Sequence, residues 1–245
     1  MSIARLMQQA AAGVPVSSAV DPYFSNVTCL LHFDGANGGT TFTDSSGNCT
    51  ITGNANAQTT TSQVKYGTAS LDCSAGNAYV YVSSATTGVM DFGTGDFTIE
   101  CWVYRTSSGS RDFICDSRKN VGNSGSFFLR VDTDNKLHWA ANGTSNSAKS
   151  TNTVAINQWV HLAVAREGTD IRLFIDGNLE NTSTLSSSLV DETNGTYPPI
   201  IATTGFTWGG TSPALNGYMD DFRITKGVAR YTASFTPPTS AFPDS

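Results

Sequence analysis

The fold is decided by one stretch, which reads Trp159-Val160-His161-Leu162-Ala163-Val164-Ala165-Arg166-Glu167-Gly168 and, two residues later, Ile171-Arg172-Leu173-Phe174-Ile175-Asp176-Gly177. The first run has apolar side chains at both odd and even positions. Because successive side chains of a strand point to opposite faces, the run predicts a central strand covered on both sides. Asp176-Gly177 is a typical hairpin turn. The stretch therefore predicts two neighbouring strands and a hairpin.

Short strands separated by Gly, Asn and Asp are expected along the rest of the chain, and no internal repeat interrupts them. Such a pattern predicts an all-β fold with two stacked antiparallel sheets. We expect strands near residues 27–33, 48–53, 68–73, 78–82, 96–104, 112–116, 126–131, 136–141, 158–167, 170–176, 199–203 and 216–225.

Composition excludes two classes of partner. Only 14% of the 245 residues are charged, and the formal net charge is −6. Nucleic-acid binding needs clustered Lys and Arg to displace counterions, and the sequence contains no such cluster. No apolar run approaches the ~18 residues that a membrane helix requires. We therefore expect neither nucleic-acid binding nor membrane insertion.

Five cysteines stand at positions 29, 49, 73, 101 and 115. Their number is odd and no CxxC pair exists, so a structural zinc site is not predicted. Cys101 shares one strand face with Phe97, Ile99 and Val103, and Cys29 and Cys73 have similar apolar surroundings. We expect buried free thiols and assembly in a reducing compartment, with a disulfide framework as the alternative.

The first 26 residues differ in character from the rest and are interpreted as an anchoring arm and linker before a domain over residues 27–245. Helical spacing relates Ile3, Leu6, Met7 and Ala10, and Gly13 provides a C-terminal cap. Such a helix is too short to be stable alone in water. We therefore expect the arm to dock, either on its own domain or on a partner.

Carboxylates are not arranged for hydrolysis. A glycanase needs two acidic groups close together, which alternate positions of one strand would provide. Glu100 has Thr98 and Trp102 as its neighbours two residues away, and Glu192 stands beside Asp191 in an expected loop. No catalytic residue and no cofactor are predicted, and the chain is not expected to be an enzyme.

Histidines and loop aspartates were considered as ligands. His32, His138 and His161 are isolated from one another in sequence, and we interpret them as structural residues. Calcium needs oxygen ligands, and Asp34, Asp44 and Asp220 would supply them if the first and last strands were neighbours. The alternative is that these aspartates cap turns. No metal is predicted.

Aromatic residues in loops are the candidate sugar-binding groups. Trp102, Trp139 and Trp159 fall within expected strands and are predicted to pack, although Trp139 could face outward. Trp208 lies in a glycine-rich stretch that cannot easily bury an indole, and Tyr197 precedes two prolines. We predict Trp208 and Tyr197 as carbohydrate-binding residues, with the alternative that Trp208 covers a sheet edge.

Three motifs carry a family resemblance. They are Leu31-His32-Phe33-Asp34-Gly35, Phe42-Thr43-Asp44-Ser45-Ser46-Gly47-Asn48 and Gly227-Val228-Ala229-Arg230-Tyr231-Thr232 followed by Phe235-Thr236-Pro237-Pro238. Together they resemble the laminin-G-like, concanavalin-A-like jelly-roll domains of bacteriophage structural proteins, which often begin with a short arm. The resemblance implies a two-sheet antiparallel jelly-roll, with Trp159 as its core tryptophan. It does not choose a function, because this fold hosts lectins, glycanases and adhesion modules.

Three functional hypotheses follow. The leading one is a virion surface protein, a capsid decoration, head fibre or tail-associated adhesin, assembled in the host cytoplasm. Its arm would contact capsid or tail proteins, and its sandwich would be displayed as a homo-oligomer that attaches weakly to cell-surface glycans. The second is a free carbohydrate-binding lectin module. The third is a glycoside hydrolase.

Overall fold

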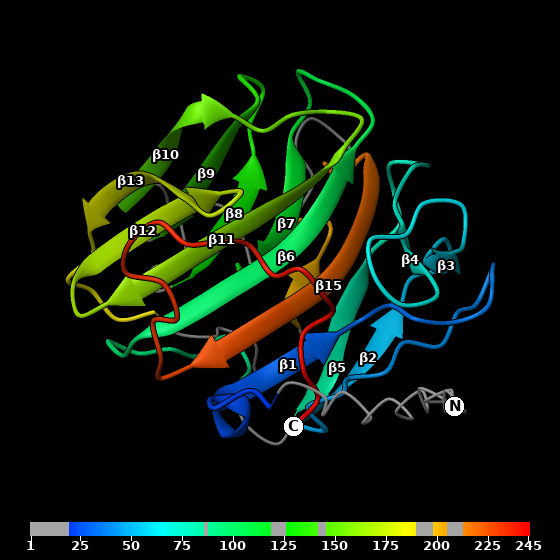
Figure 1. The fold of residues 1–245 in the computed structure, drawn as a ribbon, viewed down its shortest axis with the longest axis horizontal. Coiled ribbons are helices and arrows are strands. Elements are labelled where there is room, and N and C mark those ends of the chain that lie inside the picture. Colours follow the sequence, from blue (N-terminus) through cyan, green and yellow to red (C-terminus); the bar gives the residue numbers. More distant parts are fainter. Residues whose placement is uncertain (1–19, 86–87, 119–125, 142–145, 190–197, 205–212) are drawn as a thin grey trace, which may run out of the picture.

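The structure, a computed structural model, describes residues 20–85, 88–118, 126–141, 146–189, 198–204 and 213–245. These residues form two antiparallel sheets stacked face to face, which confirms the predicted all-β sandwich (Figure 1). The expected N-terminal helical arm falls in residues 1–19 and lies outside the described residues. The only described helix is the 3-10 turn η1 (Phe24–Asn26). No helix among the described residues is long and apolar enough to cross a membrane.

The first sheet, sheet A, places the predicted central strand among its neighbours. Its order is β13 (Asn178–Thr184), β12 (Asp170–Ile175), β11 (Trp159–Glu167), β6 (Phe97–Arg105), β15 (Gly217–Lys226), β4 (Ser70–Asp72) and β3 (Gln58–Thr60). In addition, β1 (Val27–Leu31) pairs with β15. The first and last strands are therefore neighbours, which was the condition for Asp34, Asp44 and Asp220 to come together.

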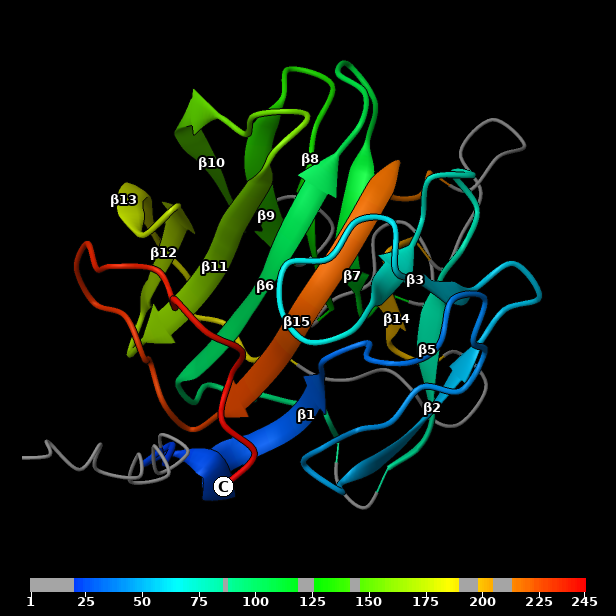
Figure 2. The same cartoon turned by 45° about the vertical axis from the view of Figure 1, so that its right-hand side comes forward.

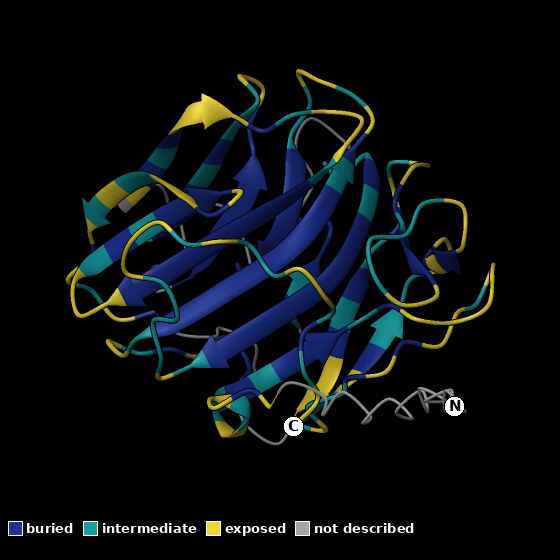
Figure 3. Ribbon diagram, in the orientation of Figure 1, coloured by how far each residue is buried: buried dark blue, intermediate teal, exposed yellow. Residues whose placement is uncertain are grey.

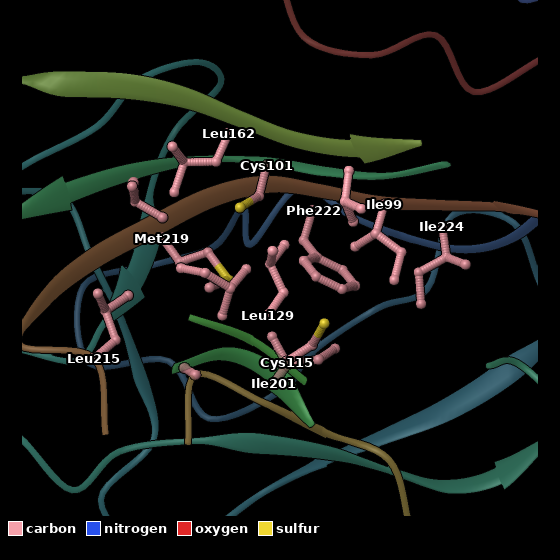
Figure 4. Close-up of a cluster of buried hydrophobic side chains, with 14 of the residues drawn as sticks. Ile99, Cys101, Cys115, Leu129, Leu162, Ile201, Leu215, Met219, Phe222 and Ile224 are labelled. Carbon is pink, nitrogen blue, oxygen red and sulfur yellow. The ribbon is translucent and has the colours of Figure 1, made fainter. Parts of the chain in front are cut away.

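The second sheet, sheet B, lies behind sheet A in Figure 1. Its order is β10 (Asn146–Thr153), β9 (Lys136–Ala141), β8 (Phe127–Val131), β7 (Asp112–Asp116), β14 (Ile200–Ile201), β5 (Val80–Ala85) and β2 (Cys49–Gly53). Apolar side chains of the two inner faces meet in one core. Figure 4 shows Cys101, Met219 and Phe222 from sheet A above Cys115, Leu129 and Ile201 from sheet B.

β11 is covered on both faces, as predicted. Its even-numbered residues from Val160 to Val164 join the core between the sheets. On the outer face, Ala163 and Ala165 pack with Phe174 beneath Tyr231 and Phe235. The cover comes from the C-terminal segment (residues 228–245), which crosses the outer face of sheet A (Figure 1). The strands beneath it are largely buried (Figure 3).

Three strands were missed by the sequence analysis: β3, β10 and β13. Each lies at or next to a sheet edge, and their sequences are polar, such as Asn146-Ser147-Ala148-Lys149-Ser150-Thr151-Asn152-Thr153 in β10. Apolar alternation is weak in such strands because little of their surface is buried. Each pairs with one neighbouring strand, and β10 and β13 are also joined across the sheets, where Glu180 accepts from the backbone and side-chain amides of Asn152 at 2.8 and 3.1 Å.

The two ends of the described chain are joined. The N–H of Asp21 donates to the carbonyl of Ser245 over 2.7 Å, and the buried Asp21 carboxylate binds Arg223 and Arg230. Residues 20–26, which the sequence analysis grouped with the linker, thus pack on the sandwich.

Burial of the cysteines follows the prediction. Cys29, Cys73, Cys101 and Cys115 are buried, Cys49 is half-buried, and all five are free thiols. In sheet B the fully buried Trp139 belongs to the core, so it does not face outward.

Gly177 is the glycine that the C-terminal segment requires. It has φ +73°, and an added Cβ would lie 2.0 Å from the carbonyl oxygen of Phe235. Gly168, at the other end of β12, has φ +58° and open space around a Cβ. Both turns therefore need a left-handed residue, but only Gly177 also needs room for the C-terminal segment.

We expect Gly168→Ala to lower the free energy of unfolding by about 1–2 kcal/mol, the cost of left-handed backbone for an L-residue. Gly177→Ala should cost more than this, because Phe235 must also move. Chemical denaturation of both variants measures the difference, and limited proteolysis reports release of the C-terminal segment in Gly177→Ala only. Equal losses without release would contradict the assigned role of Gly177.

Candidate functional site

Several predicted site residues lie outside the described part of the chain. These are the sugar-binding candidates Trp208 and Tyr197 and the arm residues Ile3, Leu6, Met7 and Ala10. Their roles stay predictions. The candidate site described below is therefore built from other residues.

Glu100 lies at the centre of a buried ion network on the outer face of sheet A. Its carboxylate accepts from Arg223 Nη2 at 2.7 Å and from the Tyr231 hydroxyl at 2.8 Å. Arg223 Nη1 donates to Asp21 over 3.0 Å, and Arg230 Nη2 donates to Asp21 over 2.6 Å. We call Asp21, Glu100, Arg223, Arg230 and Tyr231 the ion network. It joins β6 and β15 to both ends of the described chain.

Charge pairing fixes the protonation of this network. Burial alone would raise the pKa of Glu100, but Arg223 and the nearby His161 lower it to about 2. Hydrogen bonding to Arg230 likewise keeps the pKa of Asp21 low against the effect of burial. Glu100 is fully buried and permanently ionised at neutral pH, so it can neither donate a proton nor reach a substrate.

His161 is structural, as predicted. Its ring is fully buried, with Nε2 3.2 Å from Glu100, and packs edge-on against Trp102 and Phe235. Its backbone N–H donates to Asp176 over 2.8 Å. These contacts place His161 beneath the C-terminal segment, away from any open surface.

The three aspartates considered for calcium bind backbone instead. Asp220 accepts from the N–H groups of Lys65 and Tyr66, Asp34 accepts from Thr68, and Asp44 holds its own turn through Ser46, Asn48 and Cys49. In the described residues these carboxylates do not gather into one ligand cluster. The turn-capping alternative accounts for Asp44, and the other two hold the segment of residues 65–68 against sheet A.

His32 joins the first strand to the end of the chain. Nδ1 lies 2.5 Å from Asp221, and Nε2 lies 2.7 Å from Asp244. Burial alone would lower the pKa of His32, but the two carboxylates raise it to about 9. Asp221 can contact His32 because it sits at a bulge of β15, where its φ is 46°. His32 is thus a protonated structural residue at neutral pH.

A second polar cluster lies on the outer face of sheet B. Arg130 donates to Asp132 over 2.9 Å, and Arg130 and Arg118 lie over the ring of Phe128 at 4.5 and 4.2 Å. Burial and the charge of Arg130 lower the pKa of His138 to about 4, so this histidine is neutral at pH 7. These side chains are mostly buried and occupied with one another, so the structural interpretation of His138 holds.

The expectation that Trp159 is a core tryptophan is wrong. Trp159 is the first residue of β11 and lies on its outer face, where the C-terminal segment covers Ala163 and Ala165 but leaves Trp159 partly exposed. It packs edge-on against Tyr104 with ring centroids 5.8 Å apart. Tyr104 packs in the same way against Tyr218 at 5.9 Å.

We call Trp159, Tyr104 and Tyr218 the aromatic row. Strand register aligns the three residues, since Tyr104 of β6 is opposite both Trp159 of β11 and Tyr218 of β15. All three side chains are partly exposed. Figures 1 and 2 show that the C-terminal segment leaves this end of β6 and the start of β15 uncovered. The row is therefore an aromatic surface that the described residues leave partly open.

Polar groups extend the aromatic row on two sides. Asp72 of β4 is opposite Tyr218, and the exposed Gln58 of β3 is opposite Asp72. Beyond the strand ends, the hydroxyl of Thr106 donates to the side-chain oxygen of Asn216 over 2.8 Å. Carboxylate, amide and hydroxyl groups beside an aromatic surface are the components of a site for a polar, hydroxyl-rich ligand.

The positions next to the aromatic row on β6 and β15 are buried. Trp102, two residues before Tyr104, is almost fully buried beneath Lys65 and Tyr66, with the Lys65 ammonium 3.8 Å from its ring centre. Asp220, two residues after Tyr218, is fully buried, and burial raises its pKa to about 7. Residues 65 and 66 thus form one border of the open surface.

Sequence reasoning missed Tyr104 and Tyr218. The available signal was their place in the period-two pattern: each lies outside the core-facing set of its strand, next to core residues Val103 and Met219. Cross-strand register, which joins them to Trp159, cannot be obtained from one strand at a time.

Residues 74–230, more than half of the chain, match the laminin-G family described as the concanavalin A-like lectin/glucanases superfamily. The chain belongs to this superfamily. Its name covers both lectins and glucanases, so membership fixes the fold and leaves the activity open. No curated protein matches the chain.

Solved structures of the same fold include domain 4 of AbnA, a GH43 extracellular arabinanase from Geobacillus stearothermophilus, in complex with arabinotriose. It is 18% identical, with a TM-score of 0.58, and the match covers 83% of this chain and 94% of that one. The binding domain of botulinum neurotoxin DC in complex with SialylT is 17% identical, with a TM-score of 0.58 over 84% of this chain and 49% of that one. The chain thus spans about half the length of the neurotoxin domain. At these identities the matches show the shared fold.

His32 predicts the response of the fold to alkaline pH. Its pKa is about 9 in the folded state against about 6.5 in an unfolded chain, so protonated His32 stabilises the fold. This contribution is complete below about pH 6.5 and is lost as the pH rises through about 9. We expect wild type to lose more stability than His32→Gln between about pH 6 and about pH 10.

Urea unfolding at the two pH values measures this difference, and subtracting the variant removes the effects of other titrating groups. His138→Gln is a control of opposite sign: the folded pKa of His138 is lowered to about 4, so near pH 6 only its unfolded form binds a proton, and this variant should lose slightly more stability than wild type over the interval. Identical pH profiles for wild type and His32→Gln would contradict the assigned pairing of His32 with Asp221 and Asp244.

Proposed function

We propose that the chain is a non-catalytic carbohydrate-binding domain in which the aromatic row is the floor of the sugar site. The observation that carries this proposal is the alignment of three partly exposed rings on adjacent strands, beside Asp72 and Gln58. Aromatic rings offer flat apolar surface for the C–H face of a sugar, while carboxylate and amide groups bind its hydroxyls. Two structures of the same fold, solved with arabinotriose and with SialylT, support the proposal.

Binding without cleavage is favoured by the carboxylates near the row. Hydrolysis of a glycosidic bond needs two carboxyl groups facing one substrate. Of the nearby acids, Glu100 is buried in the ion network, and Asp220 is buried and accepts two backbone N–H groups. Asp72 is the partly exposed one, and it accepts from the backbone and hydroxyl of Ser74. Among the described acids near the row, Asp72 is therefore accessible, and the exposed Asp176 accepts from the backbone N–H of His161.

We further propose that the domain is displayed on a bacteriophage particle, as a capsid decoration, head fibre or tail-associated adhesin. The support is the resemblance carried by the motifs near His32, Asp44 and Arg230, together with the predicted arm. On this proposal, residues 1–19 contact capsid or tail proteins, and the chain is assembled in the host cytoplasm as a homo-oligomer. A single shallow site binds weakly, and many copies on one particle would raise the overall avidity by orders of magnitude.

The sugar site is tested on a glycan array with the full chain, beside an assay for released reducing ends. We expect binding without release. Tyr104→Ala and Tyr218→Ala should each weaken binding by about tenfold, since an anchoring aromatic residue is worth more than ~1.4 kcal/mol. Tyr218→Phe should retain affinity, because it keeps the ring.

Tyr81→Ala is the matched control. Tyr81 is also partly exposed and packs against another tyrosine, Tyr79, at 6.4 Å, but it lies on β5 of sheet B. We expect this variant to bind as wild type does. Loss of binding in Trp208→Ala alone would move the site to the loop predicted from the sequence, and release of reducing ends would overturn the non-catalytic assignment.

The arm is tested by deleting residues 1–19. The truncated chain keeps Asp21 and the ion network, so we expect its unfolding transition to stay within about 0.5 kcal/mol of wild type. Mass spectrometry of purified particles should find the full chain and lack the truncated one. A full chain with Ile3, Leu6 and Met7 changed to Ser should behave like the truncation. Normal incorporation of either variant would remove the anchoring role.

A further inference from the structure

Two thiols from different sheets meet at one edge of the sandwich. Cys29 belongs to β1 of sheet A, and Cys49 is the first residue of β2 of sheet B. Their sulfur atoms and one carboxylate oxygen of Asp44 all lie within 4.8 Å of one another. The Cys49 thiol donates to Asp44 Oδ2 over 3.3 Å. No other group of three His, Cys, Asp or Glu side chains in the described residues is arranged in this way.

These three side chains could be considered as ligands of a metal ion, but the hydrogen bonds of Asp44 argue against a metal site. Asp44 Oδ1 accepts from the N–H of Leu30 at 2.8 Å and from the N–H of Ser46 at 3.1 Å. Oδ2 accepts from the N–H groups of Asn48 and Cys49 at 2.9 and 3.0 Å. The Ser46 hydroxyl approaches both oxygens at 2.8 Å. These donors already use the lone pairs that a metal would need, which leaves two thiols and no third ligand.

Access to the pair is one-sided. Cys29 is fully buried, and its hydrogen bond with Cys49 and its burial both raise the pKa of its thiol. Cys49 is partly exposed, so its thiol can be reached from solution and can lose its proton to solvent. A reagent from solution therefore meets Cys49 first, and Cys29 is positioned as the second thiol.

We propose that Cys29 and Cys49 form a reversible disulfide by exchange with a small-molecule disulfide such as oxidised glutathione. Deprotonated Cys49 attacks the glutathione disulfide, forms a mixed disulfide and releases one glutathione thiol. Cys29 then attacks the sulfur of Cys49, closes the protein disulfide and releases the second glutathione, which takes up the proton that Cys29 loses. The two protein thiols are oxidised, and one glutathione disulfide is reduced to two thiols.

The bond would covalently link β1 of sheet A to β2 of sheet B, which pair with other strands and not with each other. It would close a loop of about 20 residues around the Asp44 turn, and such a loop restricts the unfolded chain. We expect the oxidised protein to unfold at higher denaturant concentration than the reduced protein. The inference is independent of the proposed sugar site.

Cys101 and Cys115 form a natural comparison within the same molecule. They also come from opposite sheets (Figure 4), but both are fully buried in the centre of the core. Burial raises the pKa of both thiols. We expect this pair to stay reduced in the folded protein, because neither thiol can be reached from solution.

The test uses the full chain, reduced and then equilibrated with glutathione mixtures of increasing oxidised fraction. Intact mass should show the loss of two hydrogen atoms, and peptide mapping should place the bond between Cys29 and Cys49. Cys29→Ser should stop at one glutathione adduct on Cys49, and Cys49→Ser should not react. Cys101→Ser, the control, should oxidise as wild type does.

Three results would overturn the proposal. The first is a stable glutathione adduct on wild-type Cys49 that never closes to the disulfide. The second is a bond between any other pair, or thiols that react only after unfolding. The third is one zinc ion retained by the reduced full chain and lost in Cys29→Ser and Cys49→Ser.

Discussion

The pairing of Glu100 with Arg223 is the interaction on which the outer half of the structure depends. Both groups are almost completely buried, and they connect the central strands β6 and β15 to Asp21, Arg230 and Tyr231. Removing one member of a buried pair leaves an uncompensated charge and typically costs about 3–5 kcal/mol. The pair also helps to hold the C-terminal segment across sheet A, because that segment supplies Arg230 and Tyr231. Coverage of β11, burial of His161 and the turn at Gly177 all follow from this position.

The same arrangement divides the outer face of sheet A into two parts with different properties. Beneath the C-terminal segment, the charged side chains are buried and form ion pairs with one another. At the other end of the strands, the segment is absent, and the aromatic row meets solvent beside Asp72 and Gln58. The covered part of this face is structural. The uncovered part holds partly exposed aromatic residues on strands that are fixed by hydrogen bonds. Rigid placement lowers the entropy that a ligand-binding side chain must lose.

Whether a strand or a site residue could be predicted from the sequence depended on how far it is buried. β11, β12 and the hairpin at Asp176 and Gly177 were predicted because strongly buried strands and positive-φ turns restrict residue type. The polar strands β10 and β13 were not predicted, since hydrogen bonds between sheet edges restrict residue type very little.

Glu100 was recognised as lacking a carboxylate partner, but its real partners are 123 and 131 residues away in sequence. Trp159 was assigned to the correct face with the wrong environment, because the extent of the covering segment depends on tertiary contacts. The aromatic row required register between three strands, which a single sequence does not contain.

The hydrogen bond between Asp21 and Ser245 holds both ends of the described chain on the same side of the sandwich. Both ends of the described chain leave it beside β1, at the end of sheet A opposite the aromatic row (Figures 1 and 2). Anything joined at residue 20 or residue 245 therefore sits at one pole, and the aromatic surface occupies the other. A domain immobilised through either of these ends would point the aromatic row into solution, and neighbouring copies held in the same way would present their rows in parallel. Attachment at either of these ends would therefore leave the aromatic row facing away from the support.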